Sequence, residues 1–121
     1  MRNETIDSLR FFLCVENLSL DQLDRARLAY PTAHFAVRPA TQMPYASISF
    51  QPNELSILLN SVEQNAINER ANTSIDVLAD SHVAWGEFIL PPEIIEAASA
   101  HSIPVRIAFA ISADNHSKQD M

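Results

Sequence analysis

Glycine is almost missing from this sequence, since Gly86 is the only one among 121 residues. The dinucleotide-binding fingerprint and the P-loop each need several glycines, so neither phosphate-binding loop is present. Tight turns that need a positive φ must therefore use asparagine or aspartate, or be avoided. The shortage excludes two nucleotide-binding loops and limits how the chain can turn.

Cysteine and long apolar runs are scarce as well. Cys14 is the single cysteine, so no intrachain disulfide can form, which fits a reducing compartment. The first residues lack the apolar segment of a signal peptide, and no apolar run approaches the ~18 residues of a membrane helix. We therefore expect a cytoplasmic protein that does not associate with a membrane.

Positive charge is the third shortage. Eight lysines and arginines stand against 15 aspartates and glutamates, which gives a formal net charge of −7. The basic residues do not cluster, so nucleic acid is not an expected partner. A negative surface attracts a basic protein, although the same charge also serves simply to keep a protein soluble.

The apolar pattern predicts one α+β domain over residues 1–121. Strands are expected at residues 8–15, 34–38, 45–50, 73–80, 83–90 and 103–112, because apolar side chains alternate there or run continuously. Helices are expected to follow Ser19, Asn53 and Pro91. The predicted order is β-α-β-β-α-β-β-α-β, with three helices on one face of a mixed, mainly antiparallel sheet of about six strands. Residues 1–7 and 113–121 are polar and are expected to be flexible tails.

Each predicted helix carries local signals. Ser19 and Gln22 have the spacing of a capping box, before an apolar stripe made of Leu20, Leu23 and Leu28. The second helix has the strongest period of 3.6 and should end near Arg70, with Asn72 in a left-handed conformation. Its stripe is Leu55, Leu58, Leu59, Val62, Ala66 and Ile67. The third helix should end near His101 and bury Ile94, Ile95 and Ala98.

No metal, cofactor or nucleophile site is expected. The four histidines His34, His82, His101 and His116 have no metal-ligand spacing among themselves or with Cys14. Cys14 lies in the middle of an apolar strand, where a cysteine is more often a small buried hydrophobe than a nucleophile. We therefore predict no catalytic residue.

A partner-binding patch is the more credible site. Asp76, Asp80 and Glu87 converge if a turn at Ser81 and His82 joins their strands as a hairpin. Trp85 lies among them, and tryptophan, tyrosine and arginine dominate interface hot spots. The predicted partner-binding residues are Asp76, Asp80, Trp85, Glu87 and Tyr45. Acid–base catalysis and a solvated sheet face remain alternatives for the acidic cluster, and a lone tryptophan is often a core residue. The strand arginines Arg10, Arg38 and Arg106 are expected to pair with carboxylates such as Asp76 or Glu87, with binding of an anionic ligand as the alternative.

Two segments of the sequence resemble a known protein family. The first runs from Arg10 to Leu13 and on through Leu18 to Leu23; the second runs from Glu87 to Ala98 and on to Ile103–Ile107. Together they are similar to a family of small bacterial α+β domains of unknown function whose members are often suspected to be immunity proteins. That family usually ends in a strand, Ser-Pro-Glu-Leu, a helix, a glycine and a strand. Here Leu90-Pro91-Pro92-Glu93 replaces the first motif and Ser102 replaces the glycine, and the motifs carry no catalytic residue.

Three functions follow as hypotheses. The first is a non-enzymatic, cytoplasmic protein-binding module, most specifically an immunity protein that neutralises a basic, nuclease-like toxin domain. The second is a small-ligand-binding or minor enzymatic domain with a pocket between helices and sheet, lined by Arg38, His34 and Tyr45. The third is a structural homodimer that pairs through an exposed edge strand.

Overall fold

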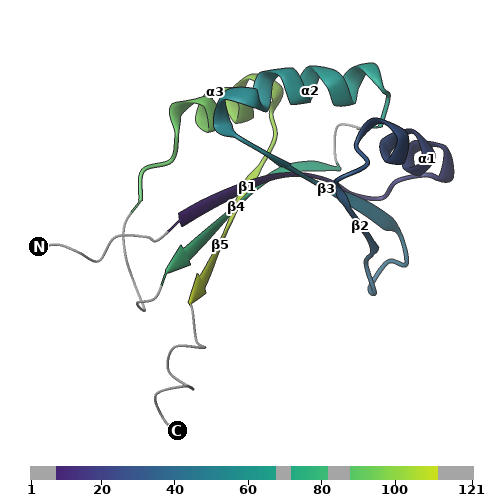
Figure 1. The fold of residues 1–121 in the computed structure, drawn as a ribbon, viewed down its shortest axis with the longest axis horizontal. Coiled ribbons are helices and arrows are strands. Elements are labelled where there is room, and N and C mark those ends of the chain that lie inside the picture. Colours follow the sequence, from purple (N-terminus) through teal and green to yellow (C-terminus); the bar gives the residue numbers. More distant parts are fainter. Residues whose placement is uncertain (1–7, 68–71, 82–87, 112–121) are drawn as a thin grey trace, which may run out of the picture.

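A computed structural model describes residues 8–67, 72–81 and 88–111 (Figure 1). Five strands, three α-helices and one short 3-10 helix follow one another in these ranges. In chain order they are β1 (Ser8–Val15), α1 (Leu20–Ala29), β2 (His34–Val37), β3 (Pro44–Phe50), η1 (Pro52–Glu54), α2 (Leu55–Gln64), β4 (Thr73–Ser81), α3 (Pro92–His101) and β5 (Val105–Ile111).

The strands form one mixed sheet in the order β2-β3-β1-β4-β5. All neighbours are antiparallel except β4 and β5, which are parallel and joined through α3. The α+β prediction is therefore confirmed, with β1 to β4 and the first two helices in the split βαβ arrangement. The described residues hold five strands and not about six. Most of the strand predicted at 83–90 lies outside the described residues, and Phe88–Leu90 are not in a strand.

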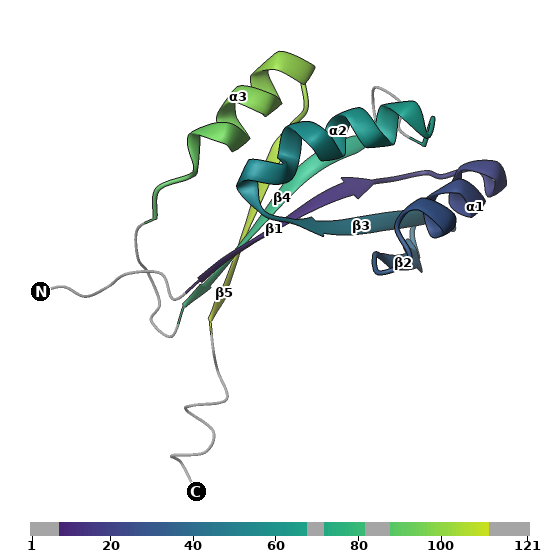
Figure 2. The same cartoon turned by 45° about the horizontal axis from the view of Figure 1, so that its top comes forward.

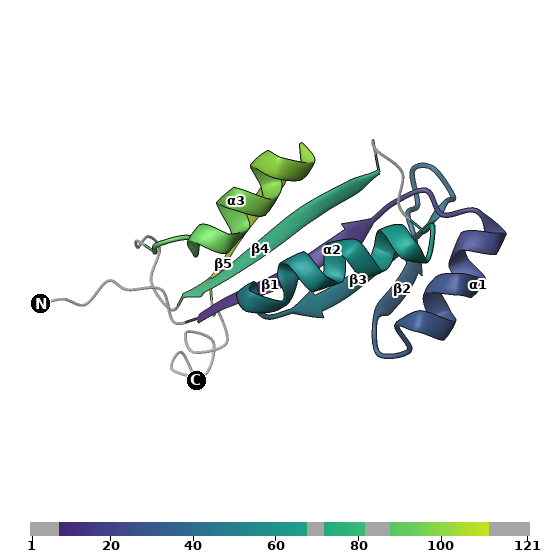
Figure 3. The ribbon, with the colours of Figure 1, turned by 90° about the horizontal axis from the view of Figure 1, so that it is seen from above.

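All three helices lie on one face of the sheet (Figures 1 and 2). Seen from that side, α2 lies along the middle of the sheet, with α1 and α3 toward its two ends (Figure 3). The core forms between this layer and the sheet because β1, β3 and β4 turn alternate apolar side chains toward the helices. Its largest fully buried members include Leu13, Leu55, Leu59, Ile75 and Ile94.

Helix α1 begins as predicted and buries a different face. Ser19 Oγ accepts from the backbone N–H of Gln22 at 3.1 Å, and Gln22 Oε1 accepts from the N–H of Ser19 at 2.8 Å. Leu20 and Leu28, however, are 79% and 86% exposed, while Gln22 and Ala26 are buried. Of the predicted stripe only Leu23 packs partly buried against the core, because this helix lies near one end of the sheet and buries only a narrow strip.

Helix α2 ends earlier than predicted, at Gln64, and begins after η1 instead of with a cap at Asn53. Ala66 takes a left-handed conformation with φ 55°, and two backbone bonds close the helix, from Ala66 N to Glu63 O and from Ile67 N to Val62 O. This pair of bonds is the Schellman motif. Ile67 is buried although it lies beyond the helix, so the apolar period continues past the last helical residue.

Helix α3 closes in the same way. Ser102 has φ 55° and donates to Ser99 O, while Ile103 N donates to Ala98 O. Ile94 is buried as predicted and Ala98 packs half-buried against the core, but Ile95 is 56% exposed. Left-handed residues in the described chain are thus Asn17, Gln42, Ala66 and Ser102, so the expectation of asparagine or aspartate at such positions is confirmed at Asn17 and wrong at the other three.

The predicted flexible tails at residues 1–7 and 113–121 lie outside the described residues. Among the helices described above, none has the length and apolar character to cross a membrane.

Candidate functional site: the open face of the sheet

The face of the sheet opposite the helices, here called the open face, is covered by no described helix or strand. Strand alternation assigns its side chains, because β1 and β3 send Phe11, Leu13, Ile48 and Phe50 into the core. The open face therefore carries Ser8, Arg10, Phe12 and Cys14 from β1, His34 and Ala36 from β2, Tyr45, Ser47 and Ser49 from β3, Ser74, Asp76, Leu78 and Asp80 from β4, and Arg106, Ala108 and Ala110 from β5.

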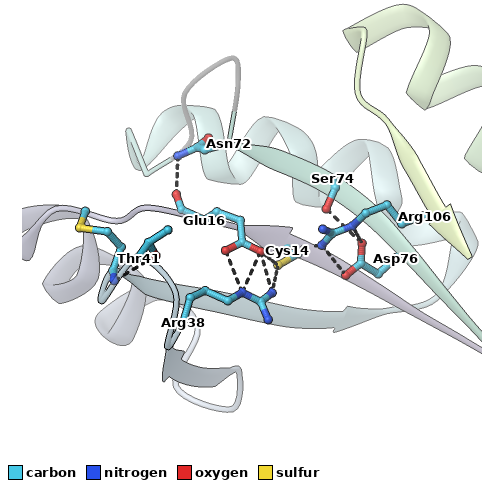
Figure 4. A network of polar contacts seen from close by, with 9 residues as sticks. Cys14, Glu16, Arg38, Thr41, Asn72, Ser74, Asp76 and Arg106 are labelled. Atoms are coloured by element: carbon cyan, nitrogen blue, oxygen red, sulfur yellow. Dashed lines mark hydrogen bonds and ion pairs between the residues drawn. The ribbon is translucent and has the colours of Figure 1, made fainter. Parts of the chain in front are cut away.

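An ion pair between Glu16 and Arg38 stands at the end of β1 on this face (Figure 4). Arg38 donates from Nε at 3.0 Å and from Nη2 at 2.6 Å to the two carboxylate oxygens. These hydrogen bonds lower the pKa of Glu16 below its ordinary value and raise the pKa of Arg38. The guanidinium also lies over the ring of Tyr45, with Cζ 3.8 Å from the ring centroid, so Tyr45 and Glu16 hold Arg38 from two sides.

A second ion pair joins neighbouring strands. Arg106 in β5 donates from Nε at 2.9 Å and from Nη2 at 3.0 Å to the two oxygens of Asp76 in β4. Ser74 also donates to Asp76, at 3.0 Å, and Asp76 raises the pKa of Arg106. Arg106 Nη2 lies 3.8 Å from Glu16, which links the two pairs into the one network of Figure 4.

Cys14 lies within this network and is not activated. Its side chain is 1% exposed, and its thiol donates to Glu16 at 3.3 Å. Burial, with a further contribution from the Glu16 carboxylate, raises the pKa of the thiol from 9.0 to about 11. A thiol held protonated in this way is a poor nucleophile, which agrees with the interpretation of Cys14 as a buried residue.

A shallow groove of about 470 Å³ crosses the open face. Both ion pairs border it, and the lining residues are Phe12, Glu16, Arg38, Asp76, Val77, Leu78, Arg106, Ile107 and Ala108. Among residues 8–67, 72–81 and 88–111, no three histidine, cysteine, aspartate or glutamate side chains group as metal ligands. The groove offers aromatic, aliphatic and guanidinium surface, which suits contact with another molecule.

Three predicted partner-binding residues lie on the open face. Asp76 and Asp80 are in β4, and Tyr45 is in β3 on the far side of β1. Trp85 and Glu87 lie outside the described residues. The convergence of Asp76 and Asp80 with Glu87 depended on a hairpin whose second strand, predicted at 83–90, lies mostly outside the described residues. Within the described residues, β4 pairs with β1 on one side and with β5 on the other.

The carboxylates on the open face are also neutralised. Asp80 accepts from Arg10 Nε at 3.1 Å and Asp76 accepts from Arg106, so the predicted pairing of strand arginines with carboxylates is confirmed. The excess acid of the described residues lies instead in the helical layer. There Arg25 and Arg27 stand with six carboxylates, namely Asp21, Asp24, Glu54, Glu63, Glu93 and Glu96.

The pocket predicted between helices and sheet has different walls from those expected. His34, Arg38 and Tyr45 belong to the open side of the sheet. A hollow of about 430 Å³ does lie where α1 and α2 meet β3, and Tyr30, Ile48, Phe50, Leu58 and Ser61 are among its lining residues. Tyr30 and Ser61 hydrogen-bond to each other through their hydroxyls.

Sequence reasoning missed Glu16, which contacts Arg38, Cys14 and Arg106. The available signal was the even-numbered series Arg10, Phe12, Cys14, Glu16, which continues the open-face alternation of β1 by one residue. Comparison of the chain with protein-family models, with curated proteins and with solved structures finds no match. The resemblance to immunity-protein-like domains therefore stays a prediction.

Proposed function

We propose that this chain is a non-enzymatic protein-binding domain that docks a basic protein on the open face. In its most specific form it is an immunity protein that neutralises a basic, nuclease-like toxin domain. The observation that carries the proposal is the stack of Arg38 on Tyr45 beside the groove. Arginine and aromatic side chains contribute most to interface hot spots, and here the carboxylate of Glu16 holds the arginine in place before any partner arrives.

Charge and contact surface have separate roles in this proposal. The net charge of −7 and the acidic helical layer attract a basic partner from a distance. The open face, where Arg10, Arg38 and Arg106 balance Glu16, Asp76 and Asp80, then makes the short-range contacts. Long-range charge acts mainly on the association rate, so salt should slow association more than it speeds dissociation.

The test uses a purified basic protein encoded beside this chain, measured by calorimetry and by binding kinetics. Tyr45→Ala should weaken binding about 30-fold, the effect of losing one hot-spot residue worth ~2 kcal/mol. Leu28→Ala is the matched control, since Leu28 is 86% exposed on α1 and should leave affinity unchanged. Absence of binding, or a larger effect of Leu28→Ala than of Tyr45→Ala, would contradict the proposal.

A role in binding a small molecule is the second candidate, favoured by the groove of about 470 Å³ with two arginine–carboxylate pairs at its border. That volume lies within the range of ligand pockets, ~300–1,000 Å³. A thermal-shift screen of charged metabolites separates the two functions. Stabilisation by one metabolite that Arg106→Gln abolishes, without any protein partner, would favour the small molecule.

A further inference from the structure

The two edges of the sheet are protected to different degrees. At one edge, β2 has only four residues and lies between Pro31 and Pro39. At the other edge, β5 has seven residues, contains neither proline nor lysine, and has no described strand on its outer side. Short strands, prolines and lysines are the usual means of preventing strand edges from pairing between molecules. The β2 edge has two of these means and the β5 edge has none.

The side chains of β5 present an apolar row beside this edge. Ile107 and Phe109 are 54% and 41% exposed, and both lie on the helix side because they pair with Val77 and Ala79. On the open face the strand carries the small residues Ala108 and Ala110, and its one charged residue, Arg106, is bound to Asp76. Pairing of another β5 strand with this edge would therefore not force like charges together.

The backbone of β5 is oriented for further pairing. Ile75 N donates to Pro104 O at 2.9 Å, which fixes the alternation of the parallel ladder between β4 and β5. Even-numbered residues of β5 direct their backbone groups toward β4, and odd-numbered residues direct theirs outward. Ile107 and Phe109 thus combine outward backbone groups with exposed side chains.

We propose that the outer edge of β5 pairs antiparallel with β5 of a second copy, about a two-fold axis at Ala108. This register overlaps all seven residues of the strand, since Ala108 is its midpoint. It places Ile107 opposite Phe109 of the second copy and Arg106 opposite Ala110 of the second copy. Odd-numbered residues then face each other with their outward N–H and C=O groups, which is the hydrogen-bonded pairing of an antiparallel ladder.

A second copy fits this edge because the strand is complementary to itself. On each side of the two-fold axis, Ile107 of one copy lies opposite Phe109 of the other copy. The small Ala108 side chains of the two copies meet at the axis itself. The two sheets become continuous, and their open faces lie on the same side of the dimer. This inference does not depend on the proposed function, although two open faces side by side would let the dimer hold two partner molecules.

The solution mass of the full chain provides the first test. Light scattering after size-exclusion chromatography, from ~1 μM to ~1 mM, should show the mass rising from 13.5 kDa toward twice that value. Ile107→Lys should raise the dissociation constant at least about tenfold, because a charge on the edge opposes pairing. Leu28→Lys makes the same change of charge on exposed α1 and should leave the dimer unchanged. A mass of 13.5 kDa across the whole range would overturn the proposal.

Cysteine cross-linking tests the register. Residues in a non-hydrogen-bonded antiparallel pair have Cα atoms ~4.5 Å apart, close enough for a disulfide. Ala108→Cys should therefore form a covalent dimer under mild oxidation, whereas Ala110→Cys, whose mate is Arg106 of the second copy, should not. The wild-type chain is the control, because Cys14 is 1% exposed. Cross-linking of Ala110→Cys but not of a folded Ala108→Cys would refute this pairing.

Discussion

The Glu16–Arg38 pair should contribute measurably to stability, unlike an ordinary surface ion pair. Glu16 is 22% exposed and Arg38 is 40% exposed, and the guanidinium makes two short charge-assisted bonds to the carboxylate. Hydrogen bonds to charged groups contribute ~1.5–3 kcal/mol, and partial exposure of the arginine reduces that value. We therefore expect Glu16→Gln to cost about 1–2 kcal/mol of unfolding free energy.

A double-mutant cycle isolates the pair from the stacking of Arg38 on Tyr45. Glu16→Gln, Arg38→Gln and the double variant, unfolded in urea and followed by circular dichroism, should give a coupling energy of about 1 kcal/mol at pH 7. The matched control is the pair Arg10–Asp80, whose side chains are 56% and 27% exposed. Its coupling should be about 0.2–0.5 kcal/mol. A Glu16–Arg38 coupling no larger than this control would refute the reasoning.

The same pair predicts a pH dependence. Because Arg38 lowers the pKa of Glu16 below its ordinary value of 4.5, folding favours the charged carboxylate. The stabilisation should be complete above pH 4.5, the value for the unfolded chain, and should be lost as pH falls through the lower folded value. Glu16→Gln should remove this contribution, so the difference in stability between wild type and variant should shrink in acid. A difference that stays constant from pH 7 to about pH 3 would contradict the assignment.

Two further predictions concern Cys14 and Ser102. With its pKa at about 11, native Cys14 should hold about 100-fold less thiolate at pH 8 than a thiol at 9.0, and should react with a disulfide reagent only after urea unfolds the chain. Fast labelling of the folded protein would contradict this. Ser102→Gly should stabilise the protein by about 0.5–1 kcal/mol, because Ser102 has φ 55°. Ser99→Gly, three residues earlier within α3, should destabilise it by a similar amount, and equal signs for both would refute the explanation.

The helix and strand pattern was predictable wherever burial follows a single period. Alternation in β1 and β3 and the stripe of α2 identified Leu13, Ile48, Leu59 and Val62 as core residues, and all four are buried. The pattern does not reveal how much of a helix the sheet can cover. Helix α1 therefore leaves Leu20 exposed even though its residue types suggested burial.

Helix ends were harder to predict because the sequence lacks the usual glycine signal. Asn72 was expected to end α2, yet Ala66 takes the left-handed conformation. The buried side chain of Ile67 fixes this ending by returning to the core immediately after the turn. Tertiary packing of Ile67 thus decides where α2 ends, although an alanine such as Ala66 disfavours a positive φ.

The candidate site was predicted only in its members on β3 and β4. Tyr45, Asp76 and Asp80 share the open face, but Asp80 is paired with Arg10 and Asp76 with Arg106. Arg38 is paired with Glu16, which the sequence pattern did not single out. Which carboxylate meets which arginine depends on strand order, and strand order is set by non-local pairing that a sequence pattern does not contain. The sequence pattern for that reason did not predict that the excess carboxylates of the described residues lie in the helical layer.

The place of β1 at the centre of the sheet also has a consequence for synthesis. Translation completes this strand first, yet its partner β4 ends at Ser81, about 66 residues after Val15. At ~5–20 residues per second, a ribosome needs about 3–13 s to cover that distance. During this interval Phe11 and Leu13 have no complete sheet to join, so the nascent chain must keep an apolar segment from aggregating. Chaperone dependence during translation should therefore be concentrated on Ser8–Val15 and should fall once β4 emerges.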